Sequence, residues 1–209
     1  MRKAILLLTM LTLAVACREP KAGFQTGDIV FVGLPADYPD STGGLNLIHV
    51  AILEMAPEGP MIIESTIKRG VARHPLDTMM QGLVLRNGGY PTLFVKRLKD
   101  GFDPQYLENA KALIGRPYDT ELDPGNNSYY CTELLQQTYR RTDGTPLFPN
   151  VPMDFRKPGS EEFPPYWVRL FGSIGLPMPQ GVPGTTPQDI CDSPLLEPVE
   201  ADFFQLMRK

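Results

Sequence analysis

The nine residues from Leu45 to Leu53 read Leu-Asn-Leu-Ile-His-Val-Ala-Ile-Leu, and this largely apolar run predicts a buried β-strand. Similar runs over Ile29–Val32, Met61–Ile67 and Leu93–Leu98 predict three further strands. The segment Ala56–Pro60 contains Pro and Gly and has the length of a hairpin turn, so the strands on either side of it are expected to be neighbours. The first half of the chain is therefore expected to form a sheet.

Two helices are expected after these strands. Asp103 precedes Pro104 and predicts an N-cap with proline at the first helical position, and Gly115 is expected to close that helix. A second helix is expected over Cys131–Arg141. Strands first and helices later predict an α+β fold in one domain, with a small antiparallel sheet or barrel packed against helices.

The composition excludes several classes of protein. The chain has 209 residues and a formal net charge of −4, so it lacks the positive field that nucleic-acid binding needs. With only 3 Cys and 2 His, a structural zinc cluster is not expected, and no motif for a phosphate, metal or other cofactor is present. Of the 22 prolines, 12 lie between Pro146 and Pro198, so an irregular C-terminal segment with one short helix near Trp167 is expected.

The N-terminus resembles the export signal of a bacterial lipoprotein. Positive residues precede the uncharged run Ala4–Ala16, which is too short to span a bilayer and predicts a signal peptide over residues 1–16. Leu13-Ala14-Val15-Ala16-Cys17 resembles a lipoprotein box, which implies cleavage before Cys17 and acylation of that cysteine. Residues 17–25 would then tether a domain spanning residues 26–209 to a membrane of the cell envelope, facing the periplasm or the exterior. Ordinary secretion, with Cys17 as a spare thiol, is the alternative.

His49 and Glu64 are polar residues in otherwise apolar predicted strands. A buried Glu needs a partner, and the intervening turn can bring Glu64 next to the imidazole of His49. Such a bond would fix the tautomer and the orientation of the ring, as the third member of a catalytic triad does. A hydrogen-bonded histidine in the core is the alternative interpretation.

Cys131 is expected at the start of the second helix. The unsatisfied N–H groups and the positive dipole at that end favour a thiolate, and the same amides could stabilise an oxyanion. A small buried hydrophobic residue is the alternative, since free cysteine is often one.

Four segments of the chain resemble a known family of enzymes. Gly27–Phe31 and His49–Ile52 are similar to the strand motifs of NlpC-type papain-like cysteine peptidases. In the ordinary members the nucleophile motif precedes these strands, whereas here Gly115–Tyr118 and Tyr129–Leu134 follow them. That order resembles the circularly permuted YiiX/YaeF-like subgroup, which is also related to lecithin retinol acyltransferase.

The resemblance implies a role for each residue of the site. Cys131 would be the nucleophile, His49 the general base and later acid, and Glu64 the residue that orients His49. Tyr118 would position the substrate or its oxyanion, and Tyr130 would form a wall of the substrate site. No metal or other cofactor is implied.

The expected function is that of a thiol hydrolase cleaving an amide bond, and a cell-wall peptide is the first substrate class that the resemblance implies. The acyl bond of a lipid or N-acyl amino acid is an alternative, and a non-catalytic binding lipoprotein is an alternative of another class. His74, before a proline, is expected in a loop, and Cys191 is expected to be a packed thiol, neither with an identified role. The oligomeric state is left open.

Overall fold

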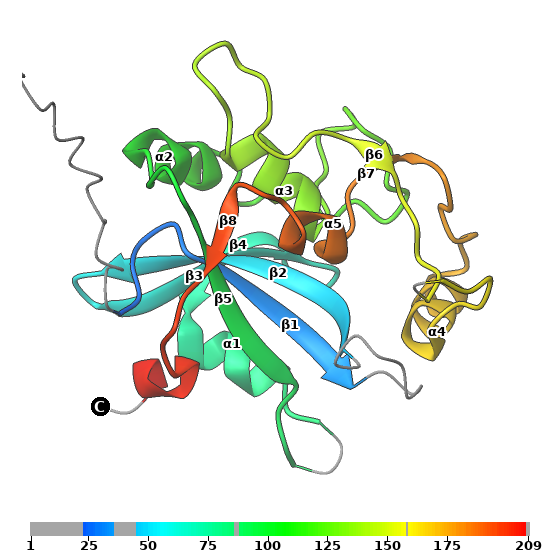
Figure 1. Ribbon diagram of the computed structural model, residues 1–209, viewed down its shortest axis with the longest axis horizontal. Coiled ribbons are helices and arrows are strands. Elements are labelled where there is room, and N and C mark those ends of the chain that lie inside the picture. The colour runs from blue at the N-terminus through cyan, green and yellow to red at the C-terminus, as the bar shows by residue number, and fades with distance from the viewer. Residues whose placement is uncertain (1–22, 36–44, 86–87, 158, 208–209) are drawn as a thin grey trace, which may run out of the picture.

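The computed structural model describes residues 23–35, 45–85, 88–157 and 159–207, so the expected signal peptide and Cys17 lie outside the described residues. Its elements are arranged as shown in Figure 1. In chain order they are β1 (Ile29–Pro35), β2 (Leu45–Ala56), β3 (Gly59–Thr66), β4 (Gly70–Pro75), α1 (Leu76–Gly82), β5 (Thr92–Leu98), α2 (Pro104–Ala112), α3 (Cys131–Thr138), β6 (Val151–Pro152), α4 (Pro165–Ile174), β7 (Pro183–Gly184), α5 (Pro187–Cys191), β8 (Leu196–Pro198) and a 3₁₀ helix, Phe203–Met207.

Six strands form one antiparallel sheet in the order β4-β3-β2-β1-β5-β8. The register between β1 and β2 shifts at one point, where Val32 pairs with His49 but Gly33 pairs with Leu47. This irregularity is a β-bulge, which gives β2 one extra residue next to His49. Bulges change the direction of nearby side chains and are frequent beside active sites.

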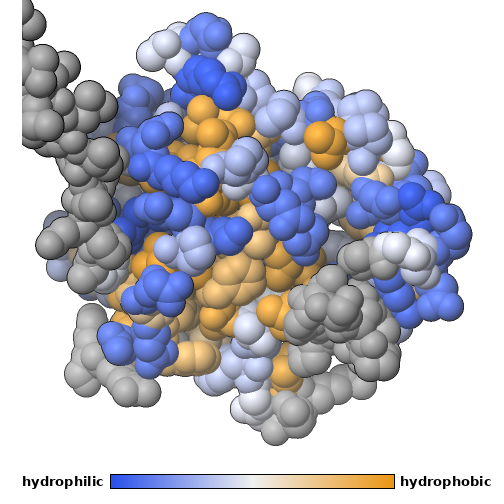
Figure 2. Space-filling model, in the orientation of Figure 1, coloured by the Kyte–Doolittle hydropathy of each residue, from blue (hydrophilic) through white to orange (hydrophobic). Residues whose placement is uncertain are grey.

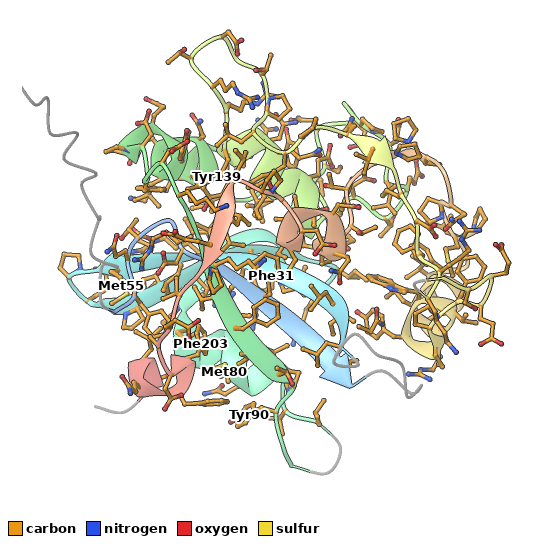
Figure 3. The ribbon with its side chains drawn as sticks, viewed as in Figure 1. Phe31, Met55, Met80, Tyr90, Tyr139 and Phe203 are labelled. Atoms are coloured by element: carbon orange, nitrogen blue, oxygen red, sulfur yellow. The ribbon has the colours of Figure 1, made fainter. Side chains whose placement is uncertain are left out.

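Helices cover both faces of the sheet (Figure 1). On one face, α2, α3 and α5 pack on strand residues that include Phe31, and Tyr139 belongs to this layer. On the other face lie α1 and the C-terminal 3₁₀ helix, represented by Met80 and Phe203. Figure 3 shows Tyr139 on one side of the sheet and Met80 and Phe203 on the other. The expected α+β fold is confirmed, and the antiparallel sheet is open.

The Gly27-Asp28 pair before β1 is structural. Gly27 has a φ of 87°, and a Cβ atom there would overlap the ring of Phe102. The buried Asp28 carboxylate accepts two hydrogen bonds from Arg97 of β5, at 2.6 and 2.8 Å. The hydroxyl of Tyr139, which follows α3, donates to the Gly27 carbonyl oxygen at 3.0 Å. This motif therefore fixes β1 against both β5 and the helix that carries Cys131.

The expected elements are found, with differences in their ends and with added elements. The helix from Pro104 ends at Ala112 rather than at Gly115, α1 was not expected, and the C-terminal segment has α5 in addition to the helix near Trp167. The Asp103 cap with Pro104 at the helix start is confirmed, but the helix that begins at Cys131 ends at Thr138 rather than Arg141. The expectation that His74 lies in a loop is wrong, because it belongs to β4, which pairs with β3 along Met61–Thr66. A six-residue strand that ends at proline has too little alternation to be recognised in the sequence alone.

The proline-rich segment packs as a third apolar cluster around α4. Trp167 and Phe171 of α4 contact Phe155 edge to face, and the Trp167 indole N–H donates to the Asn46 side-chain oxygen at 3.1 Å, which ties α4 to β2. On the face shown in Figure 2, apolar side chains gather near the middle and hydrophilic ones surround them. Within the described residues, no helix has the length and apolar character needed to cross a membrane.

Candidate active site

Cys131 is the first residue of α3. At this end of a helix the backbone N–H groups have no partner within the helix. Tyr130 before it has an extended backbone, and within the described residues no side chain caps this end. Cys131 is a free thiol with 7% of its surface exposed. The nucleophile expected from the sequence therefore lies beside amide groups that can bind a developing oxyanion.

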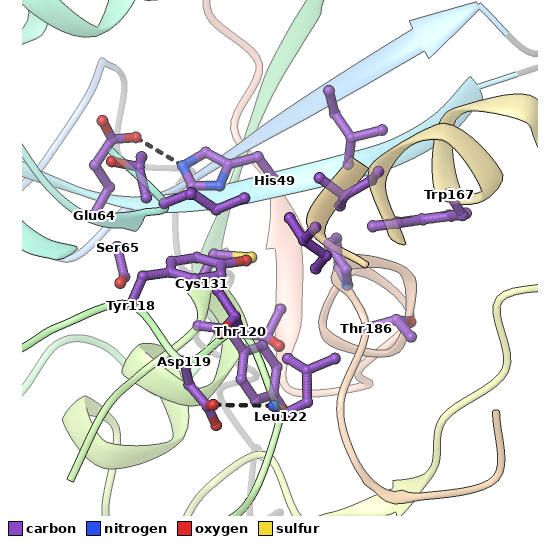
Figure 4. Close-up of a pocket in the computed structure, with 18 of the residues that line it drawn as sticks. His49, Glu64, Ser65, Tyr118, Asp119, Thr120, Leu122, Cys131, Trp167 and Thr186 are labelled. Atoms are coloured by element: carbon purple, nitrogen blue, oxygen red, sulfur yellow. Dashed lines mark hydrogen bonds and ion pairs between the residues drawn. The ribbon is translucent and has the colours of Figure 1, made fainter. Parts of the chain in front are cut away.

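The structure brings His49, Glu64 and Cys131 together. The Nε2 atom of His49 lies 2.7 Å from the Oε2 atom of Glu64, and the Cys131 side chain is close enough to the His49 ring to raise its pKa. Figure 4 shows the imidazole between the carboxylate and the sulfur. Because Nε2 is hydrogen-bonded to Glu64, Nδ1 is the ring nitrogen that can exchange a proton with the thiol. This is the order of contacts that a Cys-His-carboxylate triad requires.

The environment favours the charged forms of His49 and Glu64. Burial opposes protonation of His49, but its interactions with Cys131 and Glu64 outweigh burial and raise its pKa to about 10. Burial likewise opposes ionisation of Glu64, yet hydrogen bonds from His49 and His74 hold the pKa of that carboxyl well below its usual range. The site therefore favours an imidazolium next to an ionised carboxylate at neutral pH.

His74, which had no expected role, contacts the same carboxylate. Its Nε2 atom lies 2.9 Å from Oε1 of Glu64. Glu64 pairs with Ala72 across the β3–β4 ladder, so His74 is its diagonal neighbour two residues further on. The sequence signal for this contact is weak, because it depends on recognising β4 as a strand and on its register with β3.

Two further hydrogen bonds hold the Cys131 segment in place. The hydroxyl of Ser65, adjacent to Glu64, donates to the Tyr129 carbonyl oxygen at 2.5 Å. The hydroxyl of Thr132 donates to the Thr185 carbonyl oxygen at 2.6 Å. The first bond ties the loop before Cys131 to β3, and the second ties α3 to the C-terminal segment. The sequence did not reveal either contact.

A pocket of about 320 Å³ opens beside Cys131 and His49. Tyr118 lies next to Cys131 in Figure 4, and burial raises the pKa of Tyr118 well above its ordinary value. Tyr130 also lines the pocket, but its hydroxyl accepts a hydrogen bond from the Thr185 N–H at 3.3 Å. One side of the pocket is a largely apolar wall that comes from α4 and the segments near it: Leu122, Met153, Phe155, Tyr166, Trp167, Leu170, Phe171 and Ile174. The β3–β4 turn contributes charged residues to the lining, Lys68 and Arg69.

Two buried carboxyl groups lie close enough to affect each other: Asp119, which lines this pocket, and Glu133 of α3. Asp119 accepts hydrogen bonds from the backbone N–H groups of Glu121 and Leu122 through Oδ1, but its Oδ2 atom and Oε2 of Glu133 are buried without a partner among the described residues. Burial, followed by the charges of Asp119 and Asp123, raises the pKa of Glu133 to about 8. Glu133 is therefore largely protonated at neutral pH.

The remaining cysteine of the described chain is separate from the pocket. Cys191 is a buried free thiol in α5, as expected, and burial raises its pKa. Within the residues that the structure describes, no group of three or more His, Cys, Asp or Glu side chains could hold a metal ion. The spacings of 2.7 and 2.9 Å around Glu64 are those of hydrogen bonds between the side chains themselves.

Comparisons with known proteins agree with this architecture. A family model described as "Permuted papain-like amidase enzyme, YaeF/YiiX, C92 family" matches residues 23–200. The crystal structure of the metalloprotein YiiX from Escherichia coli O157:H7 is similar, with a TM-score of 0.59 and 22% identity over 85% of this chain and 97% of that chain. No curated protein matches the chain. The chain therefore belongs to the family of permuted papain-like amidases of the YaeF/YiiX type, which are hydrolases acting on amides.

Proposed function

We propose that the protein is a thiol amidase in which Cys131 is the nucleophile, His49 the general base and acid, and Glu64 the residue that orients His49. The observation that carries the proposal is the chain of contacts from Glu64 through His49 to Cys131 at the start of α3. These three residues come from separate elements, and burial alone would not align them in this order.

The geometry supports a two-step reaction. With the Cys131 proton transferred to His49, the sulfur attacks the amide carbonyl carbon, and the oxyanion that forms is stabilised by amides at the α3 N-terminus. His49 then gives its proton to the leaving nitrogen as the C–N bond breaks, which leaves an acyl-thioester on Cys131. In the second step His49 takes a proton from water, the water oxygen attacks the thioester carbonyl, and the C–S bond breaks. The carboxylic acid product leaves, and the Cys131 sulfur is restored with the proton again on His49.

The lining of the pocket bears on the substrate. A cell-wall peptide is the substrate class that the family resemblance implies first. The wall built from Trp167, Leu170 and Phe171 is apolar, however, and this observation favours the second candidate, an amide whose acyl side carries a hydrocarbon chain. Tyr118 and Thr120 form a more polar side of the same pocket and suit the amide end of either substrate.

Selective alkylation tests the enzyme against the alternative of a binding protein. In an enzyme with a Cys131–His49 ion pair, iodoacetamide should label Cys131 near neutral pH much faster than Cys191. Equally slow labelling of both thiols would support the binding protein. A panel of wall peptides and N-acyl amino acids, assayed for amide hydrolysis, then separates the two substrate classes, and a preference for wall peptides would reject the acyl amide.

We also propose that Cys17 anchors the protein to a membrane of the bacterial envelope through acyl chains. The support is the sequence alone, namely the uncharged run Ala4–Ala16 followed by Cys17. A Cys17→Ala variant should move from the membrane fraction to the soluble fraction. If this variant still sediments entirely with membranes, the anchor lies elsewhere.

A further inference from the structure

His74 shares the Glu64 carboxylate with His49. Oε2 of Glu64 faces His49 at 2.7 Å, and Oε1 faces His74 at 2.9 Å. Only 4% of the surface of Glu64 is exposed. A buried carboxylate needs partners for both oxygens, so His74 meets a requirement that His49 alone leaves unmet.

The surroundings of His74 indicate its charge. Its Nε2 atom faces Glu64, and its Nδ1 atom lies 3.1 Å from the carbonyl oxygen of Pro75. A carbonyl oxygen and a carboxylate both accept hydrogen bonds only, whereas a neutral imidazole has a single N–H to donate. A neutral ring would direct one lone pair at an acceptor in a largely buried place. The imidazolium form donates to both partners.

We propose that His74 is a positioning residue of the Cys131 site, an imidazolium that holds the Glu64 carboxylate ionised and directed at His49. The inference rests on the proposed function and deepens it. His74 does not touch the sulfur or the substrate in this arrangement, and its effect on Cys131 passes through Glu64 and then His49.

The local charges are consistent with this role. The hydrogen bond to Glu64 raises the pKa of His74, while burial and the nearby charge of Arg69 oppose the rise. Glu64 therefore has an ionisable donor on each side. With His74 protonated, the negative carboxylate remains compensated during the stage of the reaction in which His49 has given up its proton.

A double-mutant cycle tests the path of the effect. His74→Gln should slow alkylation of Cys131 by iodoacetamide at pH 7 about tenfold, because Glu64 loses its charged partner. In a Glu64→Gln background the same change should have no further effect. Arg73→Gln is the matched control on β4, since Arg73 pairs with Glu54 and Glu58 rather than Glu64, and it should leave the rate unchanged. Equal slowing by His74→Gln with and without Glu64 would overturn the proposal.

The ¹⁵N spectrum of the His74 ring in the unmodified protein gives a second readout that does not depend on a folded variant. Protons on both nitrogens at pH 7 support the proposal, and a neutral tautomer overturns it. The two proposals fail differently. If Cys131 is no more reactive than Cys191, the thiol amidase fails, whereas a reactive Cys131 that is insensitive to His74→Gln rejects only the role of His74.

Discussion

The imidazole of His49 and the carboxylate of Glu64 meet at 2.7 Å beyond the point where the backbones of β2 and β3 are paired. The ladder between these strands extends only as far as Ile52 and Ile63, so the contact is made by side chains and not by the sheet. Cys131 reaches the same imidazole from α3. The site thus lies at the open end of the β2–β3 hairpin, past the last residue pair between these two strands, where β2 is still paired with β1 and β3 with β4.

Removal of the nucleophile should abolish catalysis. Cys131→Ala is expected to lower amide hydrolysis by about 10⁴-fold or more, since Cys131 supplies the one thiol of the pocket among the described residues. Cys191→Ala is the matched control, because it also removes a buried thiol but leaves the pocket intact. Hydrolysis by the Cys131→Ala protein at the normal rate would exclude the mechanism.

The alkaline limit of activity should follow His49. Its pKa is raised to about 10, so the imidazolium that protonates the leaving nitrogen persists as the pH rises and is lost through about pH 10. The charge on His49 also stabilises the folded state. This contribution to the free energy of unfolding is fully present below pH 6.5 and is lost as the pH rises through about 10. In Glu64→Gln, a cause of the raised pKa is removed, and the alkaline limb of kcat should move to lower pH. If the alkaline limb of the kcat profile is unchanged in this variant, Glu64 does not raise the pKa of His49.

Glu133 should make stability depend on pH in the opposite sense. Its pKa is raised to about 8, so the folded state disfavours its ionisation, and the resulting penalty is absent below about pH 4.5 and grows until pH 8. Glu133→Gln should therefore raise the free energy of unfolding by roughly 2–3 kcal/mol at pH 7 and leave it unchanged at pH 4. Denaturant unfolding at both pH values measures the difference. A gain of equal size at pH 4 would argue against ionisation as the cause.

The apolar wall of the pocket should control the binding of an acyl chain. Leu170→Gln is expected to raise KM for an N-acyl amide about tenfold with kcat little changed, because the wall contact is lost but the reacting groups are not altered. Val168 lies on the same helix, is 53% exposed and does not line the pocket, so Val168→Gln is the control. Equal KM values for the two variants would place the acyl chain elsewhere.

Much of the fold could be predicted from local patterns. The apolar runs of β1, β2, β3 and β5 and the Asp103–Pro104 helix start are properties of neighbouring residues, and the structure has them close to the expected positions. β4 could not be predicted because its six residues carry a weak pattern. Without β4, there was no reason from the sequence to expect the contact between His74 and Glu64. The pairing of His49 with Glu64 was expected because a short turn makes those strands neighbours.

The sequence by itself determined the fold class and the three residue types at the centre of the site, because hydrophobic runs, caps and an isolated polar residue in an apolar strand are local signals. Only the tertiary structure decided that a bulge lies at His49, that Glu64 serves two histidines, and that α4 closes the pocket with an apolar wall. These features depend on register and on packing between segments far apart in the chain. Such contacts exist only once the sheet, α3 and the proline-rich segment are brought together.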